Sequence, residues 1–179
     1  PRLPFLDAQL SQLQYRSTLD DARAAIRDKR FEDAARQLTN ARSFAVPDSS
    51  EVSVLADELA RSRSEQRIDE VLAVAATRLD EGKLTSPAND NARYYYELAL
   101  GNDAANATAQ QGLIFVASQL VLKARAAIDK GQFEQAAELI GDARELDPNN
   151  SELAASTAAL QAARQAQADA ALLAERERQ

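Results

Sequence analysis

The sequence predicts an all-α protein, organised as an elongated array of helical hairpins in which long and short helices alternate. Apolar residues make up 45% of the 179 positions but aromatic residues only 5%, and alanine is the commonest apolar residue. Five glycines and five prolines are the only strong breakers, so the elements are few and long. Apolar residues also recur at spacings of three and four, which is typical of one helix face.

The breakers divide the chain into an extended lead-in at 1–6, where two prolines oppose a helix, and a series of helical stretches. We expect helices at 7–28, 31–45, 50–81, 91–100, 104–130 and 132–146, and a last helix capped by Asn149 or Asn150 that runs to the end. Residues 46–50 should end the second helix and cap the third.

The stretch 50–81 contains neither glycine nor proline, but its apolar stripe changes phase between Leu59 and Ile68. This pattern predicts one long helix whose two halves pack against different partners. Two helices, broken near residues 61–65, are the alternative.

Three of the expected short helices are related in sequence. Their shared pattern is an alanine, a large residue four positions later and another alanine three positions after that: Ala34, Leu38 and Ala41; Ala92, Tyr96 and Ala99; Ala136, Ile140 and Ala143. The first and last copies lie 102 positions apart. The middle copy has an insertion of five residues after Gly82. Stacked units of this kind bury a continuous core only together.

Residues 117–150 resemble one unit of the tetratricopeptide (TPR) family. The positions that carry the resemblance are Leu120, Ala124, Ala127, Gly131, Phe133, Ala136, Ile140, Ala143 and Pro148. Residues 15–48 match less closely, with Lys29 where the family has glycine. The resemblance implies a single TPR-like domain over 1–179, with units near 7–48, 49–103 and 104–150 and a C-terminal helix at 150–179.

The TPR resemblance also implies a protein or peptide partner, bound on the concave side of the array. That side would present Leu19 and Arg23 in the first unit, and Arg125 and Asp129 in the last. Arg23 and Arg125 occupy equivalent positions and could clamp a carboxylate. Pairing of each arginine with an acidic residue of its own helix is the interpretation that we favour.

The densest aromatic stretch is Tyr94-Tyr95-Tyr96. Tyr96 lies at the core position of the repeat, and successive helix residues point about 100° apart. Tyr94 or Tyr95 should therefore be partly exposed, either packed on a neighbouring turn or serving as an anchor for a partner.

The composition argues against several classes of function. The chain has no cysteine and no histidine, which excludes thiol chemistry and imidazole metal sites, and its net charge of −7 disfavours nucleic acid. We expect no enzyme activity and no cofactor.

Asn89-Asp90-Asn91 could offer oxygens to calcium, but capping of the following helix is the preferred role. No run approaches the roughly 18 apolar residues that span a bilayer, so any membrane anchor should lie outside these residues.

Residues 79–92 look like a segment found in TPR-like regions of bacterial envelope proteins, some of them TonB-type energy transducers and others membrane-anchored kinases. This resemblance implies a periplasmic location in a membrane-anchored parent protein. The expected function is a non-enzymatic protein–protein interaction or spacer domain. The alternative is a periplasmic sensor or regulatory domain of a membrane-anchored kinase or other signalling protein.

Overall fold

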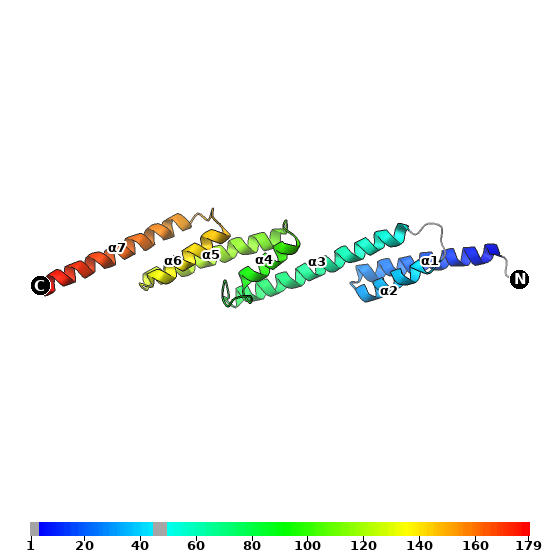
Figure 1. The fold of residues 1–179 in the computed structure, drawn as a ribbon, viewed down its shortest axis with the longest axis horizontal. Coiled ribbons are helices and arrows are strands. Elements are labelled where there is room, and N and C mark those ends of the chain that lie inside the picture. Colours follow the sequence, from blue (N-terminus) through cyan, green and yellow to red (C-terminus); the bar gives the residue numbers. More distant parts are fainter. Residues whose placement is uncertain (1–3, 45–49) are drawn as a thin grey trace. The chain divides into compact units, whose positions relative to one another are not determined.

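The computed structural model describes residues 4–44 and 50–179, and within these ranges every regular element is an α-helix (Figure 1). The helices are α1 (Pro4–Arg27), α2 (Phe31–Arg42), α3 (Ser50–Asp80), α4 (Ala92–Asn102), α5 (Ala107–Asp129), α6 (Phe133–Leu146) and α7 (Leu153–Arg178). The predicted all-α class is confirmed. The expected helix stop at 46–49 lies outside the described residues.

Several helix boundaries differ from those predicted. Helix α2 ends at Arg42 rather than at 45, and helix α5 begins at Ala107 rather than at 104. Helix α1 begins at Pro4 rather than near Asp7. The first N–H groups of a helix have no partner within the helix, so a proline, which lacks an N–H, is tolerated in the first turn. Helix α4 continues through Gly101 to Asn102. Helix α7 begins only at Leu153, because the Asn150 side chain accepts a hydrogen bond from the Glu152 N–H and holds a turn there.

Helix α3 is a single helix, with no break at residues 61–65. Contacts divide the chain into two compact units, residues 1–69 and 70–179, and their boundary falls inside α3. The first half of α3 supplies Val52, Leu55 and Leu59 to the core of the first unit. In the second half Ala75 is fully buried, so the two halves pack separately, as the change of phase predicts.

The core of the first unit is built from α1, α2 and the first half of α3. Tyr15, Leu19 and Ile26 of α1 pack with Leu38 of α2 in this cluster. Ala22 of α1 and Ala34 of α2 are fully buried there. Small residues at the crossing let the two backbones approach closely, and the larger side chains fill the space on either side.

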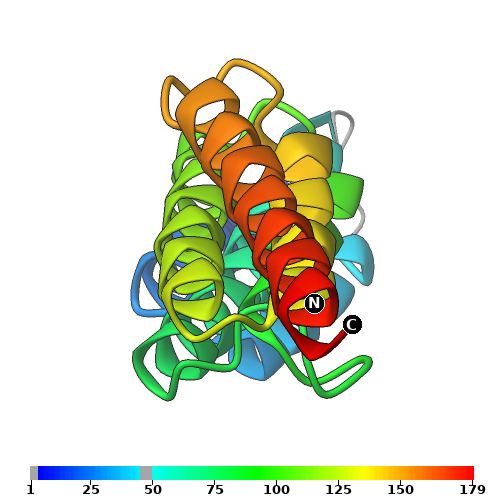
Figure 2. The same cartoon turned by 90° about the vertical axis from the view of Figure 1, so that its left-hand side faces the viewer.

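Helix α5 lies at the centre of the second unit. It packs against α4 and α6, and α7 lies across both α5 and α6 (Figure 2). Val116, Leu120 and Val121 are among its eight buried residues. Arg93 of α4 donates to Glu145 of α6 at 3.2 Å, so the two short helices are also joined at the surface.

The repeated alanine pattern has the same burial in all three short helices. Each of its six alanines is buried to within about 1% of complete, and the large residues Leu38, Tyr96 and Ile140 are 3–5% exposed. The three helices therefore use one packing face, although their remaining residues differ.

The helices that precede these short helices also end alike. Lys29, Gly82 and Gly131 all have left-handed backbone, with φ between 56° and 73°. At each end, the N–H of this residue bonds the carbonyl three positions back and the next N–H bonds the carbonyl five positions back, at 2.8–3.0 Å. This is the Schellman arrangement, in which glycine is usual. Lys29 adopts it as a non-glycine residue.

Gly112 of α5 has a packing role that the sequence does not reveal. A Cβ atom at this position would lie 2.4 Å from ring atoms of Tyr96. The corresponding residues after the other two short helices are Leu55 and Ser156, and both are buried. The copies with a side chain at this position carry Leu38 and Ile140, which are smaller than tyrosine, in the pattern. The tyrosine in the middle copy is thus accommodated by the loss of a side chain on the next helix.

Candidate interaction surface

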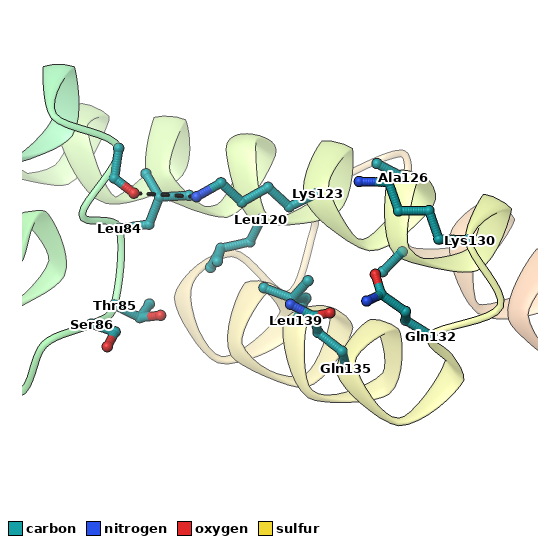
Figure 3. Close-up of a pocket in the computed structure, with 12 residues that line it drawn as sticks. Leu84, Thr85, Ser86, Leu120, Lys123, Ala126, Lys130, Gln132, Gln135 and Leu139 are labelled. Atoms are coloured by element: carbon teal, nitrogen blue, oxygen red, sulfur yellow. Dashed lines mark hydrogen bonds between the residues drawn. The ribbon is translucent and has the colours of Figure 1, made fainter.

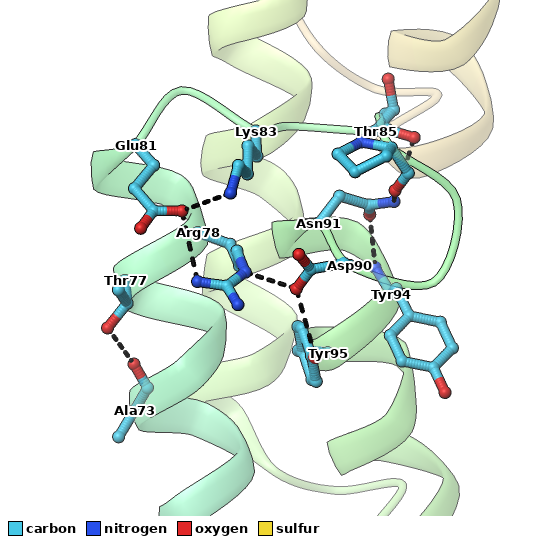
Figure 4. Close-up of polar contacts among 11 residues, drawn as sticks. Ala73, Thr77, Arg78, Glu81, Lys83, Thr85, Asp90, Asn91, Tyr94 and Tyr95 are labelled. Atoms are coloured by element: carbon cyan, nitrogen blue, oxygen red, sulfur yellow. Dashed lines mark hydrogen bonds and ion pairs between the residues drawn. The ribbon is translucent and has the colours of Figure 1, made fainter.

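The five-residue insertion lies in residues 83–91 of the connection between α3 and α4, which we call the insertion loop and which side-chain hydrogen bonds hold in place (Figure 4). Asn91, the last residue of this loop, is only 4% exposed. The Asn91 side-chain amide donates to the carbonyls of Thr85 and Pro87, at 3.0 and 2.7 Å. Its oxygen accepts from the Tyr94 N–H at 2.9 Å and so caps α4. The predicted capping role of this segment is confirmed.

Asp90 ties the same loop to the end of α3. Its carboxylate accepts from the Arg78 guanidinium, and the Tyr95 hydroxyl donates to it at 3.4 Å (Figure 4). The hydrogen bond from Arg78 holds the pKa of Asp90 below its ordinary value. A carboxylate that is charged and paired with arginine in this way stabilises the loop at neutral pH.

The three tyrosines have three different environments. Tyr96 is buried at 5% exposure, and this burial raises the pKa of its hydroxyl. Tyr95 is half-buried and faces Asp90, while Tyr94 is 37% exposed and meets the Tyr95 ring edge-to-face at 5.1 Å. The prediction that Tyr94 or Tyr95 is partly exposed is confirmed, and Tyr94 is the more accessible ring.

Further apolar side chains are exposed on α4 and α5. Leu98, one turn along α4 from Tyr94 on the same outer face, is 40% exposed. On α5, Ile114, Phe115 and Leu122 are each about half exposed. These residues lie opposite the buried stripe of their own helices. The outer faces of α4 and α5 therefore present apolar surface that the second unit does not bury.

The arginines of the predicted concave side are engaged in ion pairs. Arg23 pairs with Asp20 on its own helix at 2.8 Å and with Glu51 at the start of α3 at 2.7 Å. Arg125 pairs with Glu152, just before α7, and also donates to Ser156 at 3.2 Å. The prediction of pairing within one helix is confirmed for Arg23, through Asp20, but is wrong for Arg125, whose partner Glu152 lies just before α7. Asp129 is exposed at the last residue of α5.

A second pair of equivalent arginines, which the sequence analysis does not predict, binds the start of two short helices. Arg63 of α3 donates to the Phe31 carbonyl at 3.1 Å, and Arg164 of α7 donates to the Phe133 carbonyl at 3.3 Å. Arg63 also pairs with Glu32, the residue after Phe31, and Arg164 pairs with Glu134, the residue after Phe133. The available signal was the repeat itself, since these arginines lie 101 positions apart.

A cleft of about 340 Å³ opens between the insertion loop and the α5–α6 pair (Figure 3). Leu84, Leu120 and Leu139 contribute apolar surface to it. Its polar residues are Thr85, Ser86, Lys123, Lys130, Gln132 and Gln135. Lys123 donates to the Gly82 carbonyl at 3.2 Å, while Lys130 extends back along α5 toward Ala126 (Figure 3). The cleft therefore carries two positive charges in a chain of net charge −7.

Helix α5 is also the one helix of the described residues that is long and apolar enough, by length and composition, to cross a membrane. Counting uninterrupted apolar residues misses it, because glutamine, serine and threonine interrupt the run. Part of this segment is buried in the second unit, where α5 contacts α4, α6 and α7.

No protein-family model matches this sequence, and comparisons with curated proteins and with solved structures give no match.

Proposed function

We propose that this chain is a non-enzymatic, TPR-like interaction domain of a membrane-anchored bacterial envelope protein such as a TonB-like energy transducer. The observation that carries the proposal is the contrast between the copies. The packing triplets are alike in burial, whereas the middle copy alone adds the bonded loop and the exposed Tyr94 and Leu98. Exposed aromatic and aliphatic groups on one helix face are typical of binding surfaces.

The ion pairs of Arg23 and Arg125 favour the middle copy over the concave side as the binding site. A partner carboxylate at either arginine would have to displace Glu51 or Glu152. Binding at Tyr94 would break no ion pair. The one aromatic contact of its ring among the described residues is the edge-to-face contact with Tyr95.

A sensor or regulatory domain of a membrane-anchored kinase is the second candidate. It is favoured by α3, a continuous helix of 31 residues that contributes buried side chains to both units. A change of packing in one unit would act directly on a helix of the other.

The test is capture of partners from a bacterial envelope extract by the immobilised chain, with circular dichroism as a folding control. Tyr94→Ala should reduce capture while helicity is unchanged, and Arg23→Ala and Arg125→Ala should retain it. If the arginine variants lose capture and Tyr94→Ala does not, the concave side is the site. If the wild-type chain captures nothing, a spacer role replaces the interaction role.

A further inference from the structure

We infer that the cleft beside the insertion loop binds an extended acidic peptide, with two carboxylates on Lys123 and Lys130 and an apolar side chain between them. This inference rests on the proposed function and names the chemistry of one partner segment. The charged residues that line the cleft are both lysines, so the cleft favours an acidic ligand. The side-chain ammonium of Lys130 has no hydrogen bond or ion pair with any residue that the structure describes, so its charge is available to a ligand.

The spacing of the lysines sets the spacing of the ligand's charges. Lys123 and Lys130 lie seven residues apart on α5, which corresponds to about 10 Å along the helix. A peptide in an extended polyproline II conformation places residues three positions apart on one side, about 9 Å from each other. Its backbone groups make no internal hydrogen bonds, and the amides of Gln132 and Gln135 could bond them. Leu139 and Ala126 supply apolar contact between the charges.

The first unit provides an internal comparison. The counterpart of Lys123 in the first unit is Asp21. It lies in a hollow on α1 and α2 whose lining residues are Asp21, Ala24, Ala25, Arg30, Asp33, Arg36 and Gln37. Lys130 likewise corresponds to Asp28, which pairs with Arg30 at 3.1 Å. Because the α1–α2 pair packs with acidic residues at these positions, the lysines are not required for packing. The insertion loop that walls the cleft has no counterpart between α1 and α2.

The test is fluorescence anisotropy with the full chain and a labelled short peptide that carries two glutamates three positions apart and a leucine between them. The matched probe has glutamine in place of both glutamates. We expect binding of the acidic peptide only, weakened about two- to fivefold by Lys130→Gln or Lys123→Gln, as for exposed ion pairs. Raising the salt concentration should weaken it further. Lys83→Gln is the control, because Lys83 pairs with Glu81 at 3.0 Å and does not line the cleft.

Equal binding of the two peptides, or unchanged binding by both cleft variants, would overturn the inference. So would absence of binding to the wild-type chain. Loss of self-association in the lysine variants, measured by sedimentation, would assign the cleft to a second copy and also overturn it. None of these outcomes decides the proposed function, since Tyr94 does not line the cleft and its variant tests that function separately.

Discussion

At the scale of single residues, the middle copy differs from the others by compensated substitutions. Tyr96 replaces the aliphatic residue of the pattern, and Gly112 removes the side chain that would meet its ring. Glycine inside an exposed helix ordinarily weakens it by about 0.5–1 kcal/mol relative to alanine. Gly112 is required by close packing against Tyr96, so its replacement by alanine should destabilise the protein rather than stabilise it.

Gly112→Ala should therefore lower the free energy of unfolding, by about 1–3 kcal/mol, because the new Cβ atom overpacks the Tyr96 ring. Gly141→Ala on α6 is the matched control, since a Cβ atom there has no neighbour within 4 Å. That variant should raise the free energy of unfolding by about 0.5–1 kcal/mol. Urea denaturation of both variants measures the difference. Stabilisation by both alanines would show that the tyrosine ring does not occupy this space.

At the scale of helices, equivalent ends are built with unequal residues. The Schellman arrangement recurs at Lys29, Gly82 and Gly131, yet only the glycines avoid the steric cost of left-handed backbone. For a residue with a side chain this cost is about 1–2 kcal/mol. The end of α1 is thus less favourable than the corresponding end of α5, although both are followed by a phenylalanine that begins the next helix.

Lys29→Gly should raise the free energy of unfolding by about 1 kcal/mol, since glycine removes the steric cost but gives the unfolded chain more freedom. Gly131→Lys is the reciprocal change and should lower it by a similar amount. Thermal melts followed by circular dichroism report both shifts. The assigned helix ends would be wrong if Lys29→Gly destabilised the protein.

At the scale of the whole molecule, one helix belongs to two compact units. The absence of breakers between residues 50 and 81 and the change of phase after Leu59 are local signals, and they predicted α3 correctly. The alanine triplets likewise identified the packing faces of the short helices. Periodicity and the positions of glycine and proline were sufficient for these features because they depend on local sequence.

The sequence could not predict features that depend on contacts between distant residues. Neither the packing of Tyr96 on Gly112 nor the bond from Arg63 to the Phe31 carbonyl follows from a local pattern. Arg125 was expected to pair within its helix, and the carboxylate of Glu152, 27 positions away, forms the pair instead. The cleft depends on the path of the insertion loop across α5, which the sequence shows only as extra length.

Packing and binding are carried by different residues of the middle copy: Tyr96 packs in the core, and Tyr94 is exposed for a partner. Substitution of each tyrosine separately tests this division directly. Melting temperature and capture from an envelope extract are measured together for Tyr94→Ala and Tyr96→Ala. Tyr94→Ala should change stability by less than about 0.5 kcal/mol and lose capture. Tyr96→Ala should cost about 3–5 kcal/mol, as removal of a buried ring does, and any folded fraction should still capture. A large loss of stability in Tyr94→Ala, or undiminished capture by it, would contradict the claim.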